Sequence, residues 1–301
     1  MNGIKNLFYL LPLALFLMAC SSNDSPSPND KPVVSGKKEI KINATAAGTR
    51  VSDISFDNGD RVGIFVVNYD GNTPGTLKLS GNHVDNMAFS FSGSWVAQSP
   101  VYWKDDDTHA DFYLYYPYSA SLTSVGQIPF QVKTDQSSEQ GYKDSELLAG
   151  SVKNVAPTDR EVNITARHLM SQICIFAEPG DGFKADDLAP GKIAIKINNV
   201  LTHASLDLAA ATATATGETA SIIPGPKDNY YRALLPPQSV EETNLITVTV
   251  DGRDFNLKKA FTFEAGKVHK FTVRLTKTSN GVNVNIAPWE DDGTDNGGVA
   301  E

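Results

Sequence analysis

The sequence predicts an all-β fold made of two β-sandwich domains in tandem, and three observations support this prediction. Apolar residues recur at every second position in many short segments from Lys38 onward, which is typical of half-buried strands. No window longer than about 12 residues keeps the apolar stripe of a helix. Turn-forming Gly, Pro, Asn and Asp residues separate the alternating segments. This spacing gives roughly fourteen strands, which suits two seven-stranded sandwiches better than one.

The first 19 residues predict an export signal. The segment Leu7–Ala19 has 13 residues without a charge, follows Lys5, and is too short to span a bilayer comfortably as a helix. The Leu-Met-Ala-Cys sequence that ends at Cys20 resembles a bacterial lipobox, in which the cysteine is lipidated and becomes the first mature residue. The alternative is an ordinary signal peptide with an incidental cysteine. Residues 20–36 are polar and rich in proline, so we expect a flexible tether there.

Residues 37–164 are expected to form the first sandwich. Its first strand is Ile40–Ala46, in which apolar and polar side chains alternate. Two later segments, Val62–Val67 and Phe112–Tyr118, are apolar at both parities, which predicts central strands or strands covered on both faces. Ser145–Val152 is consistent with a single helical turn. The domain boundary is placed within Val155–Arg167, where a stretch with proline and charge precedes another apolar segment.

Residues 165–289 are expected to form the second sandwich, followed by an acidic tail over residues 290–301. Lys184–Leu188 is consistent with a second helical turn, and Asn280-Gly281 is the best hairpin turn in the chain. Alternation is clearest in four segments: Ile193–Ile197, Leu245–Val250, Lys270–Thr276 and Gly281–Ile286. The low-complexity stretch Ala209–Gly217 fits either a flat strand or a loop.

Composition excludes several classes of protein. Of the 301 residues 41% are hydrophobic, which is too many for a disordered chain. The net charge is −9, the wrong sign for a nucleic-acid binder. The two cysteines, Cys20 and Cys174, exclude a disulfide scaffold, a zinc knuckle and a cysteine-ligated iron–sulfur cluster.

The search for an active site predicts that the protein is not an enzyme. The sequence has no zinc-protease, nucleophile-elbow, phosphate-loop or dinucleotide motif, and no two of its five histidines have metal-ligand spacing. We therefore expect no catalytic residue, no metal and no cofactor. The acidic segments Asp105–Asp111 and Glu290–Asp295 lack the glycine and glutamate positions of a calcium loop, so we interpret them as solvated connectors.

Three further features have a structural and a functional interpretation. His168 opens a buried-looking strand, and we interpret it as a structural histidine. Cys174 lies among strand-forming residues with no base beside it in sequence, which favours a small buried hydrophobe over a nucleophile. Four tyrosines could form a sugar-binding platform, but we interpret them as core and edge aromatics: Tyr113, Tyr115, Tyr116 and Tyr118.

Short motifs along nearly the whole chain are similar to those of the fimbrillin-like proteins of Bacteroidales, the building blocks of pili assembled from lipoprotein precursors. Each motif is weak alone, and their order and spacing carry the resemblance. They are the lipobox Cys20, Thr49-Arg50, Phe56-x-x-Gly59-Asp60-x-Val62-Gly63-Ile64-Phe65, Val101-Tyr102-Trp103, Asp111-Phe112-Tyr113-x-Tyr115-Tyr116-Pro117-Tyr118, Asp144-x-Glu146-Leu147-Leu148-Ala149-Gly150, His168-Leu169-Met170-Ser171-Gln172-Ile173, Leu235-Pro236-Pro237-Gln238, Phe263-x-x-Gly266-Lys267 and Ile286-x-Pro288-Trp289.

The resemblance implies a fold and an assembly mechanism. The fold is two transthyretin-like, Greek-key sandwich domains. The precursor is a lipoprotein of the outer membrane and cell surface, an arginine-directed protease removes its first strand, and a neighbouring subunit donates a strand to the vacated groove. Arg50 is the candidate processing site, because it follows the strand Ile40–Ala46 after a short connector of small residues. The alternative is that Arg50 is only a surface residue.

The function expected from the resemblance is a structural and adhesive component of a fimbrium. Its partners would be other fimbrial subunits and a host or bacterial surface receptor. The alternative is a surface glycan-binding lipoprotein that does not polymerise. The sequence after Trp289 is polar and acidic, so a donor strand would be Val282–Ile286 or come from elsewhere, and tip, stalk and anchor roles stay open.

Overall fold

The computed structural model describes residues 37–47 and 56–277 in full, together with the backbone of residues 298–300. It is 58% strand and 4% helix, which confirms the all-β class. Within the described residues the strands form three sheets, one of seven strands and two of five. The Asn280-Gly281 hairpin and the strand Gly281–Ile286 lie outside the described residues.

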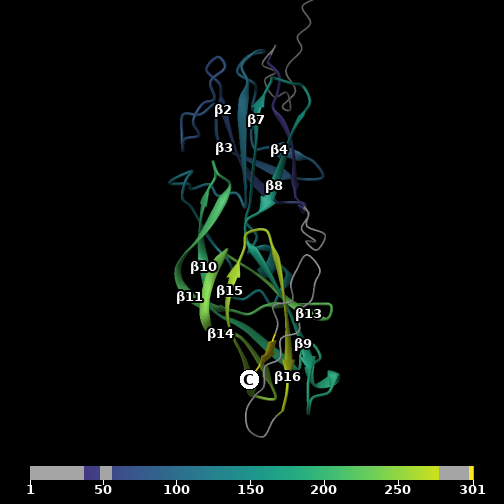
Figure 1. Cartoon of the computed structure of the whole chain (residues 1–301). Helices are drawn as coiled ribbons and strands as arrows, with labels where there is room; N and C mark the ends of the chain where they lie inside the picture. The colour runs from purple at the N-terminus through teal and green to yellow at the C-terminus, as the bar shows by residue number, and fades with distance from the viewer. Residues whose placement is uncertain (1–36, 48–55, 278–297, 301) are drawn as a thin grey trace, which may run out of the picture. The chain divides into compact units, whose positions relative to one another are not determined.

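The seven-stranded sheet contains the first strands of the chain (Figure 1). All its pairs are antiparallel except β1 with β8, which run parallel. Its spatial order is β1 (Lys41–Ala46), β8 (Glu161–His168), β7 (Leu148–Val155), β5 (Ala110–Tyr116), β2 (Arg61–Asn68), β3 (Val84–Phe91) and β4 (Trp95–Ala97).

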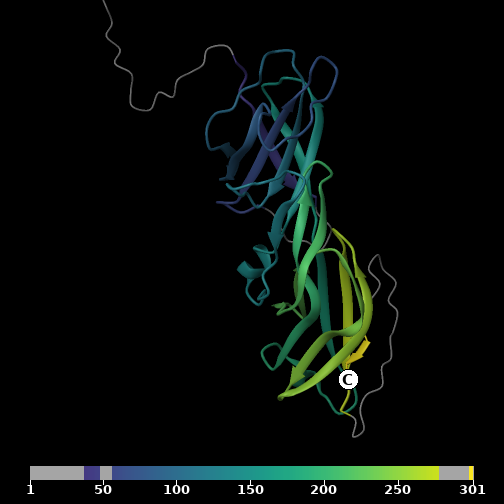
Figure 2. The ribbon, with the colours of Figure 1, turned by 90° about the vertical axis from the view of Figure 1, so that its left-hand side faces the viewer.

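The two five-stranded sheets contain the remaining strands. The long strands β10, β14 and β15 run alongside one another in both views, in green to yellow (Figure 1, Figure 2). One sheet has the order β11 (Thr212–Ile222), β10 (Ile193–Asp207), β14 (Gln238–Val250) and β15 (Arg253–Phe263), with β6 (Ile128–Gln131) also paired to β10. The other has the order β12 (Gly225–Lys227), β13 (Tyr230–Leu235), β9 (Ser171–Pro179), β16 (Val268–Leu275) and β17 (Gly298–Ala300).

The two predicted helical turns had different outcomes. The turn near residue 184 is confirmed as the 3₁₀ helix η1 (Ala185–Leu188). The helical turn over Ser145–Val152 is wrong, because residues 148–155 form β7 and the α-helix α1 (Glu139–Lys143) lies just before them. Ser138 is the residue that caps a helix here, since its Oγ accepts from the Gly141 N–H at 3.0 Å.

Strands β2 and β5 are covered on both faces, as their continuous apolar sequences predict. On β2, Ile64 and Val66 pack into one hydrophobic core, while Phe65 and Val67 pack into another. The first core lies within the seven-stranded sheet, and the second is shared with the two five-stranded sheets. Neither face of β2 can therefore be polar, which explains why its sequence does not alternate.

Residues 128–139 contact the later sheets, although they precede the expected boundary near residue 164. Strand β6 pairs with β10, and the buried Gln136 side chain is hydrogen-bonded to both backbone groups of Leu234, at 2.7 and 2.8 Å. Arg232 of β13 is paired with the Glu139 carboxylate at 2.9 Å and stacks on the Tyr142 ring. This segment therefore ties the two halves of the sequence together, and the boundary itself stays a prediction.

Gly63 of β2 lies under the ring of Tyr115. A Cβ at this position would lie 2.1 Å from Tyr115 Cε1, so no larger residue fits without moving the ring. The Tyr115 hydroxyl is fixed in place by Asn86 Oδ1 at 2.8 Å and by both backbone groups of Ser119 at 3.0 and 3.1 Å. Ring and hydroxyl together make this contact rigid.

We expect Gly63→Ala to destabilise the fold by about 1–3 kcal/mol, because it overpacks a buried contact that cannot relax. Urea unfolding followed by tyrosine and tryptophan fluorescence measures the change. Gly126→Ala is the matched control, since its nearest neighbour, Ser124 Oγ, is 4.0 Å from an added Cβ. Equal stability of the two variants would contradict the prediction.

Candidate functional site: the groove of strand β1

Strand β1 is paired to β8 residue by residue in parallel. The register runs from Lys41 opposite Glu161 to Ala46 opposite Ala166. The Asn43 Nδ2 amide donates to Asn163 Oδ1 at 2.9 Å on the outer face, so the register is fixed by side chains as well as by backbone. The strand expected over Ile40–Ala46 is thus confirmed as β1.

The inward face of β1 is apolar. Ile40, Ile42 and Ala44 are at most 5% exposed, while Lys41 and Thr45 face solvent. In β8 the buried residues Val162 and Ile164 lie opposite Ile42 and Ala44. Both strands therefore alternate in phase, and every second side chain of β1 enters the core.

The other side of β1 is also bonded. The Ile40 N–H donates to the Val101 carbonyl at 2.8 Å, and the Trp103 N–H donates to the Lys38 carbonyl at 2.9 Å. Farther along, the indole N–H of Trp95 donates to the Ala44 carbonyl at 3.1 Å. Strand β1 consequently fills a groove with two walls, β8 on one side and residues 95–103 on the other.

A buried ion pair lies where β1 ends. The Ala47 N–H donates to the Ala166 carbonyl at 2.6 Å. Two residues farther along β8, His168 Nδ1 lies 3.1 Å from Glu146 Oε2, with Glu146 only 1% exposed. Burial raises the pKa of the Glu146 carboxyl; burial also opposes the charge on His168, but Glu146 outweighs this and raises the pKa of His168.

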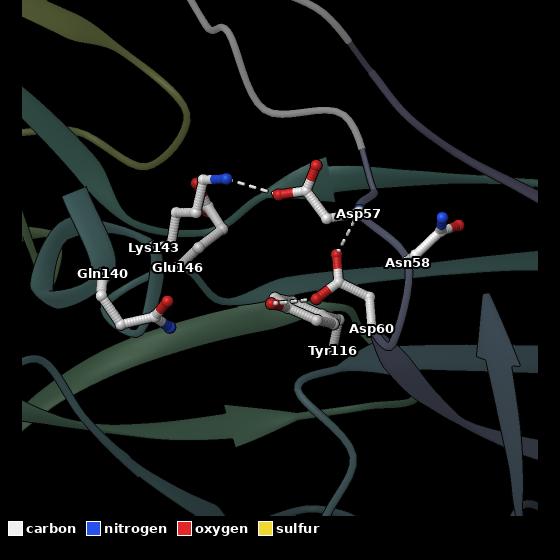
Figure 3. Close-up of a pocket in the computed structure, with 7 residues that line it drawn as sticks. All are labelled: Asp57, Asn58, Asp60, Tyr116, Gln140, Lys143 and Glu146. Carbon is white, nitrogen blue, oxygen red and sulfur yellow. Dashed lines mark hydrogen bonds and ion pairs between the residues drawn. The ribbon is translucent and has the colours of Figure 1, made fainter. Parts of the chain in front are cut away.

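A polar pocket of about 180 Å³ adjoins this ion pair (Figure 3). Its hydrogen bonds join Asp57 N to Asp60 Oδ2 at 2.7 Å and the Tyr116 hydroxyl to Asp60 Oδ1 at 3.2 Å, and Lys143 Nζ is paired with Asp57 Oδ2. Burial raises the pKa of the Tyr116 hydroxyl, so this group stays a proton donor. The lining residues are Asp57, Asn58, Asp60, Tyr116, Gln140, Lys143 and Glu146.

Comparison with known proteins assigns the family. The model of one protein family, described as fimbrillin-like, matches residues 49–289. The chain belongs to the fimbrillin-like family. This confirms the family expected from the motifs. Fimbrillin-like proteins are fimbrial and adhesion proteins and not enzymes, in agreement with the lack of catalytic motifs in the sequence.

Two relatives of this fimbrillin-like chain have fimbrial names. A Bacteroides uniformis protein named for a fimbrium subunit, Fim1C, is 26% identical over 295 residues, which cover 91% of each chain. A Bacteroides ovatus protein named for a fimbrium tip subunit, also Fim1C, is 27% identical over 160 residues, or 47% of this chain and 28% of its own length.

Two crystal structures of proteins described as cell adhesion proteins have the same fold. The one from B. uniformis aligns with a TM-score of 0.61 at 23% identity, over 79% of this chain and 93% of its own. The one from B. ovatus aligns with a TM-score of 0.63 at 15% identity, over 79% of this chain and 92% of its own. At these identities the likeness establishes the fold alone.

The two site residues expected from the sequence, Cys20 and Arg50, lie outside the described residues, as does the acidic segment 290–295. Cys174 is 2% exposed, and burial raises the pKa of its thiol to about 11, so it is a buried hydrophobe and not a reactive thiol. Within residues 37–47 and 56–277, no three carboxylate, histidine or cysteine side chains are placed to hold a metal ion. No helix in these ranges is both long and apolar enough to cross a membrane.

The four tyrosines near residue 115 do not form one exposed platform. Tyr113 and Tyr115 are at most 5% exposed and belong to the core. Tyr116 lines the pocket, and the Tyr118 ring stacks under the Arg61 guanidinium at 4.6 Å. This confirms their interpretation as core and edge aromatics.

Sequence reasoning missed the pocket. Asp60, Tyr116, Glu146 and His168 come from four different motifs of the family resemblance, and the fold brings them to one place. Nothing in their sequence spacing predicts this, because 108 residues separate Asp60 from His168. The sequence did offer one signal, which is that these polar residues stand within strand-forming motifs. A polar group buried in such a motif needs a hydrogen-bond partner, so a polar cluster could have been expected.

We expect Ile42→Ala to lower the free energy of unfolding by about 2–5 kcal/mol, because it leaves a cavity between β1 and the core. The measurement is urea unfolding of the chain with β1 in place. Lys41→Ala is the control on the same strand, and as an exposed change it should stay within about 0.5 kcal/mol of the parent. An equal fall in the free energy of unfolding of the two variants would show that the apolar inner face of β1 does not hold the strand in place.

Asp105 offers a pH test of the loop before β5. The hydroxyl and N–H of Thr108 and the N–H of Asp107 bond its carboxylate and lower its pKa to about 2. Because the folded state favours the ionised carboxylate, this stabilisation of the folded state is complete above about pH 4 and is lost as the pH falls through about 2. An NMR titration should give this midpoint, and Thr108→Val should raise it; an ordinary midpoint in the parent chain would contradict the assignment.

Proposed function

We propose that this protein is a structural and adhesive subunit of a cell-surface fimbrium, assembled by exchanging β1 for a strand of a neighbouring subunit. The observation that supports it most directly is the seating of β1 between two walls of its groove. The names of its relatives support other fimbrial subunits as its partners.

The groove has the properties that strand exchange needs. Without β1, backbone groups of β8 and of residues 101–103 would lack partners, and the apolar side chains of Val162 and Ile164 would be exposed. An open strand edge beside exposed apolar side chains favours pairing with another strand, so the empty groove would tend to bind a donor strand. A suitable donor would place apolar side chains at alternate positions, as Ile40, Ile42 and Ala44 do here.

Cleavage after Arg50 would make β1 exchangeable. The β1 strand ends at Ala46, and the chain returns to the described fold at Phe56, so Arg50 lies in the connection that holds β1 to the rest of the protein. Hydrolysis of the Arg50–Val51 peptide bond by an arginine-directed protease would consume one water molecule and leave a carboxylate on Arg50 and an amine on Val51. Strand β1 would then be held only by its non-covalent contacts.

Two finer parts of the proposal concern architecture and export. We propose two tandem transthyretin-like, Greek-key domains over residues 37–164 and 165–289, supported by one core within the seven-stranded sheet and a second core to which the two five-stranded sheets contribute most of the side chains. We also propose export as an outer-membrane lipoprotein with its lipid on Cys20, followed by the tether of residues 20–36, which the lipobox-like sequence supports.

Arg50→Ala should block both release of β1 and incorporation into fimbriae. Intact-mass analysis and N-terminal sequencing of surface protein should find Val51 at the terminus of the parent chain. The variant should keep a lipid-modified Cys20 and run as a monomer instead of a denaturation-resistant ladder. Arg160→Ala, which removes an exposed arginine from the loop before β8, is the matched control and should assemble normally.

Two results would contradict this proposal. A parent chain that assembles while retaining Cys20 would rule out removal of β1. An Arg50→Ala variant that forms ladders as well as the parent would rule out cleavage at this residue as the trigger.

A further inference from the structure

Three of the seven side chains that line the pocket of Figure 3 are carboxylates, which as anions accept hydrogen bonds and do not donate them. Gln140 uses its amide Nε2 to donate to Asp144 Oδ1 at 2.6 Å, which leaves its Oε1 as an acceptor. Asp60 accepts one bond at each carboxylate oxygen, and each oxygen has a second lone pair. The pocket is therefore suited to a group with several N–H or O–H donors.

Glu146 supplies an observation independent of the exposed acids. Its Oε2 lies 3.1 Å from His168 Nδ1, but its Oε1 has no hydrogen-bond partner among the described residues, although the side chain is only 2% exposed and lines the pocket. A buried carboxylate oxygen without a donor is costly, so a ligand that supplied one would be stabilised here.

The charge of the lining favours a cation. The three carboxylates of Asp57, Asp60 and Glu146 outnumber the positive groups, even when both Lys143 and His168 are charged. Lys143 already places its own ammonium group on Asp57, which shows the chemistry that this pocket accepts. A divalent metal fits less well, because no three such ligands within the described residues have metal-binding geometry.

We propose that this pocket binds a primary ammonium group. Its three N–H donors match the acceptors that remain on Glu146, Asp60 and Gln140, and its charge offsets the excess of carboxylates. The assigned fold and family do not require such a site.

The ammonium group can come from two sources. One is an amine-bearing molecule, such as an amino sugar or an exposed lysine. The other is the α-amino group of Val51, and this source rests on the proposed cleavage after Arg50. Val51 precedes Phe56 by five residues, the Phe56 ring is 5.7 Å from that of Tyr116, and five residues can span up to about 17 Å, so this terminus is within reach.

The first experiment uses the full exported chain, uncleaved, and titrates it with methylammonium chloride while amide NMR signals are recorded. We expect saturable shifts at Asp60 and Gln140, and a dissociation constant about tenfold weaker in Asp60→Asn and Glu146→Gln. Asp70→Asn, which changes an exposed acid beyond the other end of β2, is the control and should bind as the parent does. Asp60→Asn keeps the test valid if Glu146→Gln does not fold.

Two further probes separate the ammonium site from its alternatives. Tetramethylammonium has the charge but no N–H donor, and D-glucose has donors but no charge; neither should produce these shifts. Equal binding of either probe, or equal loss of binding in Asp70→Asn, would overturn the proposal.

The second experiment distinguishes the sources. The same chain is nicked after Arg50 by an arginine-specific protease, with β1 still seated, and the methylammonium titration is repeated. If the Val51 amino group occupies the pocket, nicking alone should shift the Asp60 and Gln140 signals, and added methylammonium should cause no further shift. If the ligand is a separate amine, the nicked chain should give the same methylammonium titration as the uncleaved chain. If neither nicking nor added methylammonium shifts the signals of Asp60 and Gln140, in the uncleaved or in the nicked chain, the ammonium site is overturned. Failure of the protease to cut at Arg50 counts only against the proposed cleavage.

Discussion

The pairing of β1 with both walls of its groove is the interaction on which the seven-stranded sheet depends. Strand β8 has β1 on one side, and its pairing with β7 extends over only two residue pairs, Leu148–His168 and Ala149–Arg167. Strand β1 therefore supplies most of the backbone partners of β8 and closes the core over Val162 and Ile164. Removing β1 would leave this edge of β8 open, and an open strand edge favours pairing with another strand.

The sequence predicted the strands better than their partners. Period-two alternation identified β1, and continuous apolar sequence identified β2 and β5 as strands covered on both faces, because local side-chain patterns record burial directly. The helical turn at residue 145 was misplaced, since Ser145 uses its hydroxyl to accept from the Lys133 N–H and to donate to the Gly141 carbonyl instead of capping a helix. Such contacts depend on the fold and leave no periodic signal.

The groove could be predicted from the sequence, but the pocket could not. Arg50 and Ile40–Ala46 could be singled out because they are neighbours in the sequence. The pocket could not, because Asp60, Tyr116 and Glu146 meet only after β5 and β7 pair and α1 folds against them. Polar residues within apolar motifs were the sole indication, and that indication does not say which of them will meet.

The parallel direction of β1 also matters for mechanics. When two parallel strands are pulled from opposite ends, the load acts along their axes, and all the hydrogen bonds between them resist it together; a hairpin pulled open at one end loses its bonds one after another. A strand seated as β1 is, in register with β8 over six residue pairs, is thus loaded in shear. The lifetime of such a joint under tension is set by its rate of rupture and not by its equilibrium stability. Under the proposed strand exchange, a short strand in this position would therefore be enough to hold neighbouring subunits together under load.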